Sequence, residues 1–357
     1  MVQHGRSTRT VPRHVLQPLV LLTLLAGAIG VTASSQQPAD RPMEVAPWPR
    51  EAENPGWLKP KAPPQAWLGL IGEYGPEREP VYIAERGGHL WAIISRGQPS
   101  QLDEASLARI FNRDGRGRAI GVTVAGVAYQ RRQVGPAEGS GQLRVEPLRP
   151  VADVLKESMT AEPPRETGDF READLVELVK MDPTIKLEIR YATTNNFLGS
   201  VFYAQARAFM QRPAAEAVVR ANQVLKKSGY GLLIHDGYRP WYVTKTFWDA
   251  TPLEKKWLVA DPSSGSRHNR GCAIDLTLYD LETGRAVEMP STYDESTPRA
   301  YAFYPGGSEL QHWHRALLRR AMEAEGFTVN PNEWWHFDHK DWKNYRIGNV
   351  AFDKIMS

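Results

Sequence analysis

Two short segments, far apart in the sequence, constrain the fold of this chain more than any other feature. They are Ser266–Asp275, with the sequence SRHNRGCAID, and Glu333–His336, with the sequence EWWH. Together they offer imidazole and carboxylate side chains, and a catalytic metal site needs three such ligands and a base that does not bind the metal. We therefore expect a fold that brings both segments to one site.

The first segment runs into a stretch that alternates as a strand does. From Gly271 to Tyr279, side chains at even positions are apolar, and Asp275 falls on the opposite face. Asp275 is therefore expected to face a cleft, with His268 in the loop before it. Cys272 is on the apolar face, so we interpret it as a small buried hydrophobic residue rather than a catalytic thiol.

The second segment places Glu333 three residues before His336. In a flat strand these side chains would face opposite ways, so we expect a helical turn or tight bend after Pro331-Asn332. His336 could then bind metal while Glu333 acts as the base. Arg239, after a buried strand, could supply a fixed cation for a developing oxyanion. Each residue alone has a structural alternative, such as a core histidine or a salt bridge. Only the joint pattern favours a catalytic metal site.

The N-terminus has the features of a secretory signal peptide over residues 1–33. Arg6, Arg9 and Arg13 precede an apolar run that ends in small residues. The alternative is an uncleaved membrane anchor, although the run is short and interrupted by Pro18. We expect export across the inner membrane to the periplasm, without stable membrane insertion once the signal is removed.

Charge and cysteine content exclude several classes of protein. The predicted signal contains three of the 44 Lys and Arg residues and none of the 41 Asp and Glu residues, so the remainder is electrically balanced. No nucleic-acid partner is expected from such a balance. One cysteine cannot form an internal disulfide, so stability must come from packing and from metal.

The 357 residues suffice for two domains. Residues 34–64, rich in Pro, Gln, Ala and Glu, are predicted to be a linker or disordered leader. Residues 65–150 are predicted to be a small all-β domain of unknown role, with strand-like runs at 67–71, 81–84, 89–94 and 119–124. Residues 151–168 form a polar, Pro-rich linker in this interpretation.

The remaining residues, 169–357, mix strand and helix patterns. We expect strands at 185–191 and 231–235, and helices at 214–227 and 310–325. Because the elements do not alternate strictly, the sequence predicts an α+β fold rather than a doubly wound sheet.

Four motifs in this region resemble those of the zinc D-Ala-D-Ala peptidase family, in particular its VanX-type D-alanyl-D-alanine dipeptidases. They are YATTNNFLG at 191–199, DGYRP at 236–240, the S-x-H-x-x-G-x-A-x-D-L-T-L pattern at 266–278 and EWWH at 333–336. The resemblance extends from about Phe170 to the C-terminus. It implies a Hedgehog-like catalytic domain, with an antiparallel sheet and packed helices.

The resemblance also implies roles for individual residues. One Zn²⁺ would be held by His268, Asp275 and His336, with Glu333 as catalytic base and Arg239 as stabiliser of the tetrahedral intermediate. In the family, a Ser and an Asp bind the ammonium of the substrate, and these correspond to Ser266 and Asp294. The alternative for Asp294 is a solvated loop acid.

The implied function is hydrolysis of D-Ala-D-Ala, or a related D-amino-acid dipeptide, by metal-activated water in peptidoglycan-precursor or wall-fragment metabolism. The alternatives are a D,D-carboxypeptidase or peptidoglycan endopeptidase on the same fold, and a cell-wall-binding protein with structural zinc. Two features depart from the compact family members: Arg267 lies next to the first ligand, and the predicted β domain is additional. That domain could contact peptidoglycan, shape access of substrate or mediate assembly.

Overall fold

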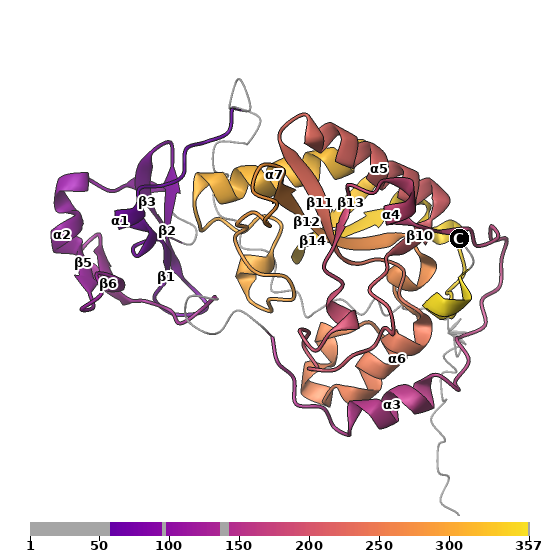
Figure 1. Cartoon of the computed structure of the whole chain (residues 1–357). Helices are drawn as coiled ribbons and strands as arrows, with labels where there is room; N and C mark the ends of the chain where they lie inside the picture. The colour runs from indigo at the N-terminus through magenta and orange to yellow at the C-terminus, as the bar shows by residue number, and fades with distance from the viewer. Residues whose placement is uncertain (1–57, 95–97, 136–142, 356–357) are drawn as a thin grey trace, which may run out of the picture. The chain divides into compact units, whose positions relative to one another are not determined.

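The computed structural model describes residues 58–94, 98–135 and 143–355 (Figure 1). The predicted signal peptide and residues 34–57 of the predicted leader lie outside these residues. Within the described ranges, no helix is both long and apolar enough to cross a membrane.

Residues 65–131, here called the N-terminal β segment, contain two antiparallel sheets. The first has the strands β1 (Gly72–Tyr74), β2 (Val81–Arg86), β3 (His89–Ile94) and β4 (Ser100–Gln101) in that order, and the second has β5 (Phe111–Arg113), β6 (Ala119–Val124) and β7 (Val127–Gln130). Gly87 and Gly88 join β2 to β3 with positive φ angles, as a tight hairpin turn requires.

The strand predicted at 67–71 is wrong. Gln65–Leu68 form a short helix, α1, which follows Pro64. Two further short helical elements, η2 (Glu104–Ser106) and α2 (Leu107–Ile110), precede β5. A short apolar run is ambiguous between helix and strand by periodicity alone, and here the preceding proline starts a helical turn.

The C-terminal half is built on a five-stranded sheet with the order β13-β14-β12-β11-β9. Its strands are β9 (Lys186–Leu187), β11 (Tyr230–Asp236), β12 (Ala273–Asp280), β13 (Phe327–Asn330) and β14 (Glu333–His339). Only the β9–β11 pair is parallel. The strand expected at 185–191 is much shorter than predicted, because a 3-10 turn, η4 (Arg190–Ala192), follows it. Two more strands, β8 (Leu175–Glu177) and β10 (Phe209–Gln211), pair separately.

Helices α5 (Arg212–Lys226) and α7 (Glu309–Ala324) lie against this sheet (Figure 1), close to the predicted boundaries. The short helix α4 (Leu178–Met181) follows β8, and α6 (Trp241–Ala250) lies beside α3 (Val151–Ser158). Helix α3 begins the predicted 151–168 linker, and its Val151 and Val154 are buried in the main core. Mixed helices and antiparallel strands make this an α+β fold, as predicted.

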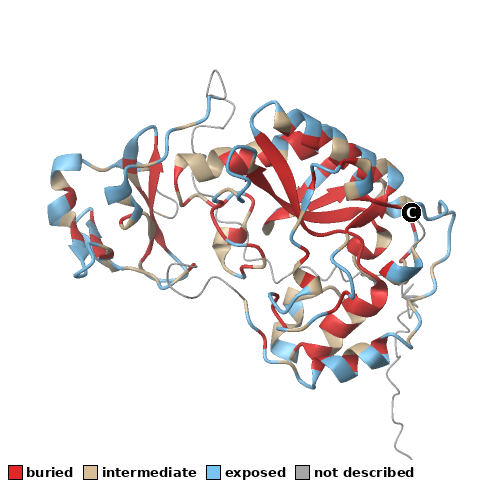
Figure 2. Cartoon of the chain, in the orientation of Figure 1, coloured by how far each residue is buried: buried red, intermediate tan, exposed pale blue. Residues whose placement is uncertain are grey.

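The centre of the sheet is almost wholly inaccessible to solvent (Figure 2). All seven residues of β11 are buried, and seven of the eight residues of β12 are buried. A polar side chain in these strands must therefore find partners inside the protein, because burying it unpaired is costly. His235, Asp236 and Asp275 are such side chains, and they lead to the candidate site.

Candidate functional site

The register of three adjacent strands aligns polar residues in one row. Asp236 of β11 pairs with Asp275 of β12, and Asp275 pairs with His336 of β14. Side chains at paired positions emerge on the same face of a sheet. A register shift between Ile234 and Asp236 completes the row by bringing Asp236 opposite Asp275.

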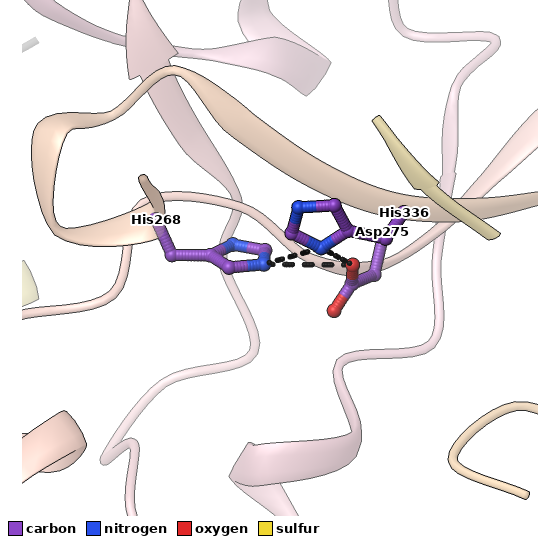
Figure 3. A group of neighbouring side chains, drawn as sticks. All are labelled: His268, Asp275 and His336. Atoms are coloured by element: carbon purple, nitrogen blue, oxygen red, sulfur yellow. Dashed lines mark hydrogen bonds and ion pairs between the residues drawn. The ribbon is translucent and has the colours of Figure 1, made fainter. Parts of the chain in front are cut away.

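His268, Asp275 and His336 converge as a possible metal-binding set (Figure 3). Nε2 of His268 lies 3.2 Å from Nδ1 of His336 and 3.5 Å from Oδ1 of Asp275. Nδ1 of His336 lies 2.9 Å from the same carboxylate oxygen. His268 comes from a 3-10 turn, η6 (His268–Arg270), which Gly271 closes with a φ of 66°. The structure thus brings together the three residues predicted as ligands.

The other nitrogen of each imidazole has an acceptor of its own. Nδ1 of His268 lies 2.8 Å from the carbonyl oxygen of Gly237, and Nε2 of His336 lies 3.1 Å from Oδ1 of Asp338. A proton shared with each acceptor leaves the facing nitrogen with a free lone pair, as a metal ligand needs. Sequence reasoning missed Asp338, although its spacing of two from His336 within a strand was a usable signal.

Asp275 is buried but held in its charged form. Burial favours the neutral acid, yet His268 and His336 outweigh it and hold the pKa of Asp275 well below its ordinary value. Its second oxygen, Oδ2, accepts a hydrogen bond of 2.9 Å from the hydroxyl of Tyr293. Tyr293 was also missed, because its contact with Asp275 depends on the path of a long loop.

Glu333 lies beside the three residues; a tight turn at Pro331-Asn332, rather than a helical turn, comes directly before it. It is the first residue of β14, and its pairing with β13 shifts register between Val329 and Asn330. This irregularity brings Oε2 of Glu333 within 3.7 Å of Nδ1 of His336. Burial, aided by Asp275, raises the pKa of Glu333. Its side chain nevertheless remains 41% exposed, so a bound small molecule can contact it.

Arg239 is fixed by a buried carboxylate. Its Nε and Nη2 donate to Oδ2 of Asp236 over 3.0 and 2.8 Å, and its guanidinium lies 5.1 Å from the ring centre of Tyr191. Asp236 also accepts from the hydroxyl of Tyr203 at 2.8 Å. Among the described residues, Nη1 of Arg239 has no hydrogen-bond partner, so its hydrogens remain for a further acceptor.

The two residues predicted to bind an ammonium are placed differently. Asp294 accepts a 3.4 Å hydrogen bond from the hydroxyl of Tyr191, and burial together with Asp275 and Glu333 raises its pKa to about 8. Ser266 instead lies before the 3-10 turn that precedes β12, and its hydroxyl accepts from the backbone N–H of Asn269 at 3.3 Å. Within the described residues, no hydrogen bond joins Ser266 to Asp294 or to the three convergent residues.

The two remaining residues singled out from the sequence lie near this site. Cys272 is fully buried, and burial raises the pKa of its thiol to about 12. Arg267 forms an ion pair with Asp338, and its guanidinium lies 4.7 Å from the ring centre of Trp342. A surface hollow of about 650 Å³, lined by Phe197 and Lys255 among others, includes none of the site residues.

Comparisons with known proteins agree with this geometry. The family model for the D-Ala-D-Ala dipeptidases matches residues 171–353. A D-alanyl-D-alanine dipeptidase of Escherichia coli K12 is 36% identical over 184 residues, which cover 52% of this chain and 94% of that protein. Enzymes with the same name from Enterococcus faecium and Streptomyces coelicolor are 35% and 32% identical, over 87% and 93% of their lengths. The resemblance inferred from four short motifs is confirmed, and the chain belongs to the D-Ala-D-Ala dipeptidase family.

Proposed function

We propose that this protein is a zinc-dependent D-alanyl-D-alanine dipeptidase that hydrolyses D-Ala-D-Ala or a related D-amino-acid dipeptide. The observation that carries the proposal is the convergence of His268, Asp275 and His336 beside an accessible Glu333. The similarity to D-alanyl-D-alanine dipeptidases over almost their full length supports the choice of substrate.

The donor set suits a zinc ion. Ligands that bind tetrahedral zinc at the usual distances are separated from one another by about 3.3 Å. The three candidate donor atoms are 2.9 to 3.5 Å apart. Both histidines also have acceptors on their outer nitrogens, as zinc-bound imidazoles almost always do. When bound, zinc would lower the pKa of a coordinated water and polarise the substrate carbonyl.

Glu333 is proposed as the general base. Its raised pKa suits a group that accepts a proton from the attacking water and later gives it to the leaving amine nitrogen. The hydrogen bond of 2.9 Å from Nδ2 of Asn330 to its Oε2 holds the carboxylate toward the site. Glu333 is not among the residues that converge as the possible metal-binding set, so it is proposed to move a proton without serving as a fourth ligand.

Arg239 and Asp294 are proposed to act on opposite charges of the reacting dipeptide. Arg239 would donate a hydrogen bond to the carbonyl oxygen as negative charge develops there, and Asp236 already fixes its orientation. Asp294 would accept from the free ammonium, with Ser266 as its proposed companion. A cation beside Asp294 would favour the ionised carboxylate, which burial otherwise disfavours.

The mechanism is tested with Glu333→Ala and three substrates. The variant should bind zinc as the wild type does, measured by metal analysis, and lose hydrolysis of D-Ala-D-Ala by about 10²–10⁴-fold, measured as released amines. Retained activity would refute the role of Glu333. For the wild type, cleavage of a wall pentapeptide but not of D-Ala-D-Ala would refute the dipeptidase assignment, and L-Ala-D-Ala tests stereospecificity.

The alternatives have less support. A D,D-carboxypeptidase or endopeptidase would act on longer peptides, whereas the related proteins named above are dipeptidases. In a wall-binding protein with structural zinc, Glu333 would have no purpose beside the donor set. We also propose that a signal peptide directs the enzyme to the periplasm, where it serves in wall-peptide metabolism, and that residues 65–150 form a small β domain.

A further inference from the structure

The loop from Pro290 to Ser308, here called the 290–308 loop, carries Asp294 into the candidate site. Asp294 has a φ of 58°, a left-handed conformation that residues other than glycine rarely adopt. Such a conformation costs free energy and persists only when surrounding contacts hold it. The contacts that hold this loop come from two parts of the protein.

On its inner side, the loop contacts the catalytic sheet. Nε1 of Trp334 donates to Oγ of Ser291 at 2.8 Å. The ring of Tyr293 stacks on His235 with centres 4.6 Å apart, and the Tyr293 hydroxyl binds Asp275. These contacts position the half of the loop that includes Asp294.

On its outer side, the loop contacts the N-terminal β segment through a buried charge. The hydroxyl of Tyr304 donates to Oε1 of Glu73 at 2.9 Å, and Arg132 lies 3.1 Å from the other oxygen of that carboxylate. The ring of Tyr304 meets Tyr82 edge-on at 5.5 Å. Glu73 and Tyr304 are each only 3% exposed. A carboxylate so deeply buried needs both of its partners, so the contact is specific in its geometry.

The end of the same loop pairs with strand β2. Ala84 and Gly307 form a parallel bridge, and the N–H of Glu85 donates to the Gly307 carbonyl at 3.1 Å. Arg86 donates from Nη1 to that carbonyl at 3.0 Å and from Nη2 to the Pro305 carbonyl at 2.9 Å. The strand therefore fixes the backbone of the loop just before α7 begins.

Arg299 lies in the middle of the loop and contacts its first half. Its Nη2 donates to the Pro290 carbonyl at 2.6 Å, and its Nε lies 3.1 Å from Oε1 of Glu295, the residue after Asp294. Glu295 is buried, so this ion pair is shielded from solvent. Arg299 is five residues before Tyr304 in the chain, so movement of the Tyr304 end of the loop would reach Asp294 through this short stretch and the ion pair with Glu295.

We propose that the N-terminal β segment is a positioning element of the active site, which holds the 290–308 loop through Tyr304 and Gly307 so that Asp294 faces the substrate ammonium. The inference rests on the proposed role of Asp294 in the dipeptidase. The segment would thereby set the affinity for the dipeptide and leave metal binding, which depends on paired strands, almost unchanged.

The test is Tyr304→Phe, which keeps the ring against Tyr82 and removes the hydroxyl from Glu73. Backbone hydrogen exchange over residues 290–300 should become about fivefold faster, as expected for the loss of one buried hydrogen bond. KM for D-Ala-D-Ala should rise about fivefold, while kcat and zinc content change by less than about twofold. A second variant, Glu73→Gln, keeps an acceptor for Tyr304 but loses the charge facing Arg132, and it should accelerate exchange to a smaller extent.

Tyr74→Phe is the matched control. Its hydroxyl donates to the Leu70 carbonyl at 2.6 Å inside the N-terminal β segment, so its loss should leave exchange in the loop and KM unchanged. Unchanged exchange at 290–300 in both Tyr304→Phe and Glu73→Gln would overturn the inference, as would an equal effect in the control. Exchange is measured without substrate, so it decides the inference even if the wild type fails to cleave the dipeptide.

Discussion

The candidate metal ligands and Asp294 belong to one site, but different kinds of structure hold them. Asp275 and His336 lie opposite each other on paired central strands, and His268 lies in the turn that leads into one of these strands. Asp294 itself has a left-handed backbone conformation, and its loop is held by contacts with Trp334 on one side and Glu73 on the other. Metal binding should therefore withstand changes in distant segments, whereas substrate binding should not.

The largest expected effect is on metal binding. Asp275→Asn removes the charge of a central donor while keeping the size of the side chain and an acceptor for Tyr293. Zinc affinity should fall by more than about 100-fold, beyond the range typical for loss of an outer partner. Competition with a chromophoric chelator measures this fall. Near-wild-type affinity would show that Asp275 is not a ligand.

A smaller loss is expected for the outer partner Asp338. Asp338→Ala removes the acceptor for Nε2 of His336 and frees the imidazole to turn or change tautomer. Zinc affinity should fall about 10–100-fold. Asp338→Asn offers a matched comparison, since its amide oxygen can still accept, and it should lose less. Equal affinities for all three proteins would argue against a role for this residue in orienting the ligand.

Asp294→Asn tests substrate binding. Asparagine is chosen because it tolerates the left-handed backbone conformation. KM for D-Ala-D-Ala should rise about 10-fold or more, the range for loss of a hydrogen bond to a charged group. Zinc affinity should stay at the wild-type value, which steady-state kinetics and chelator competition together would show. A coupled loss of metal would mean that the loop and the ligands are not held independently.

The same variant tests the raised pKa of Asp294 in the metal-free protein. Because the folded-state pKa is about 8 and the ordinary value is 3.8, the fold favours the protonated acid. Stability from this group is complete below pH ~4 and is lost as pH rises toward about 8. Relative to wild type, Asp294→Asn should therefore gain thermal stability with rising pH, by about 2–4 °C once solvent screening reduces the full effect. Melting curves at pH 4.5 and pH 9 measure this, and a constant difference would contradict it.

The smallest effect is expected at Cys272, which lies three residues before the proposed ligand Asp275 in the sequence but is buried in the core. With a pKa of about 12 the thiol stays protonated at neutral pH, so Cys272→Ala should leave kcat and KM unchanged. Unfolding in urea should show a loss of about 1 kcal/mol from the small cavity. A large loss of activity would show that Cys272 acts in the candidate site despite its burial.

Local sequence patterns predicted much of the secondary structure of the C-terminal half. The alternation from Gly271 to Tyr279 matches strand β12, and the helical periodicity matches α5 and α7 within a few residues. These predictions succeed because burial of one face imposes a regular spacing on the sequence. Short elements were less predictable, as the helix at Gln65–Leu68 and the truncated strand at Lys186–Leu187 show, because tertiary packing overrides weak local preferences.

The sequence by itself determined which chemical groups this protein offers: two imidazoles, the carboxylates of Asp275 and Glu333, and the guanidinium of Arg239. Only the tertiary structure decided how they meet. The register of β11, β12 and β14 aligns the row, and a shift beside Asn330 places Glu333 next to His336. The contact between Glu73 and Tyr304 likewise joins residues whose local sequence predicts no such pairing. Periodicity reports which face of an element is buried, whereas register and loop bracing depend on partners far away in the chain.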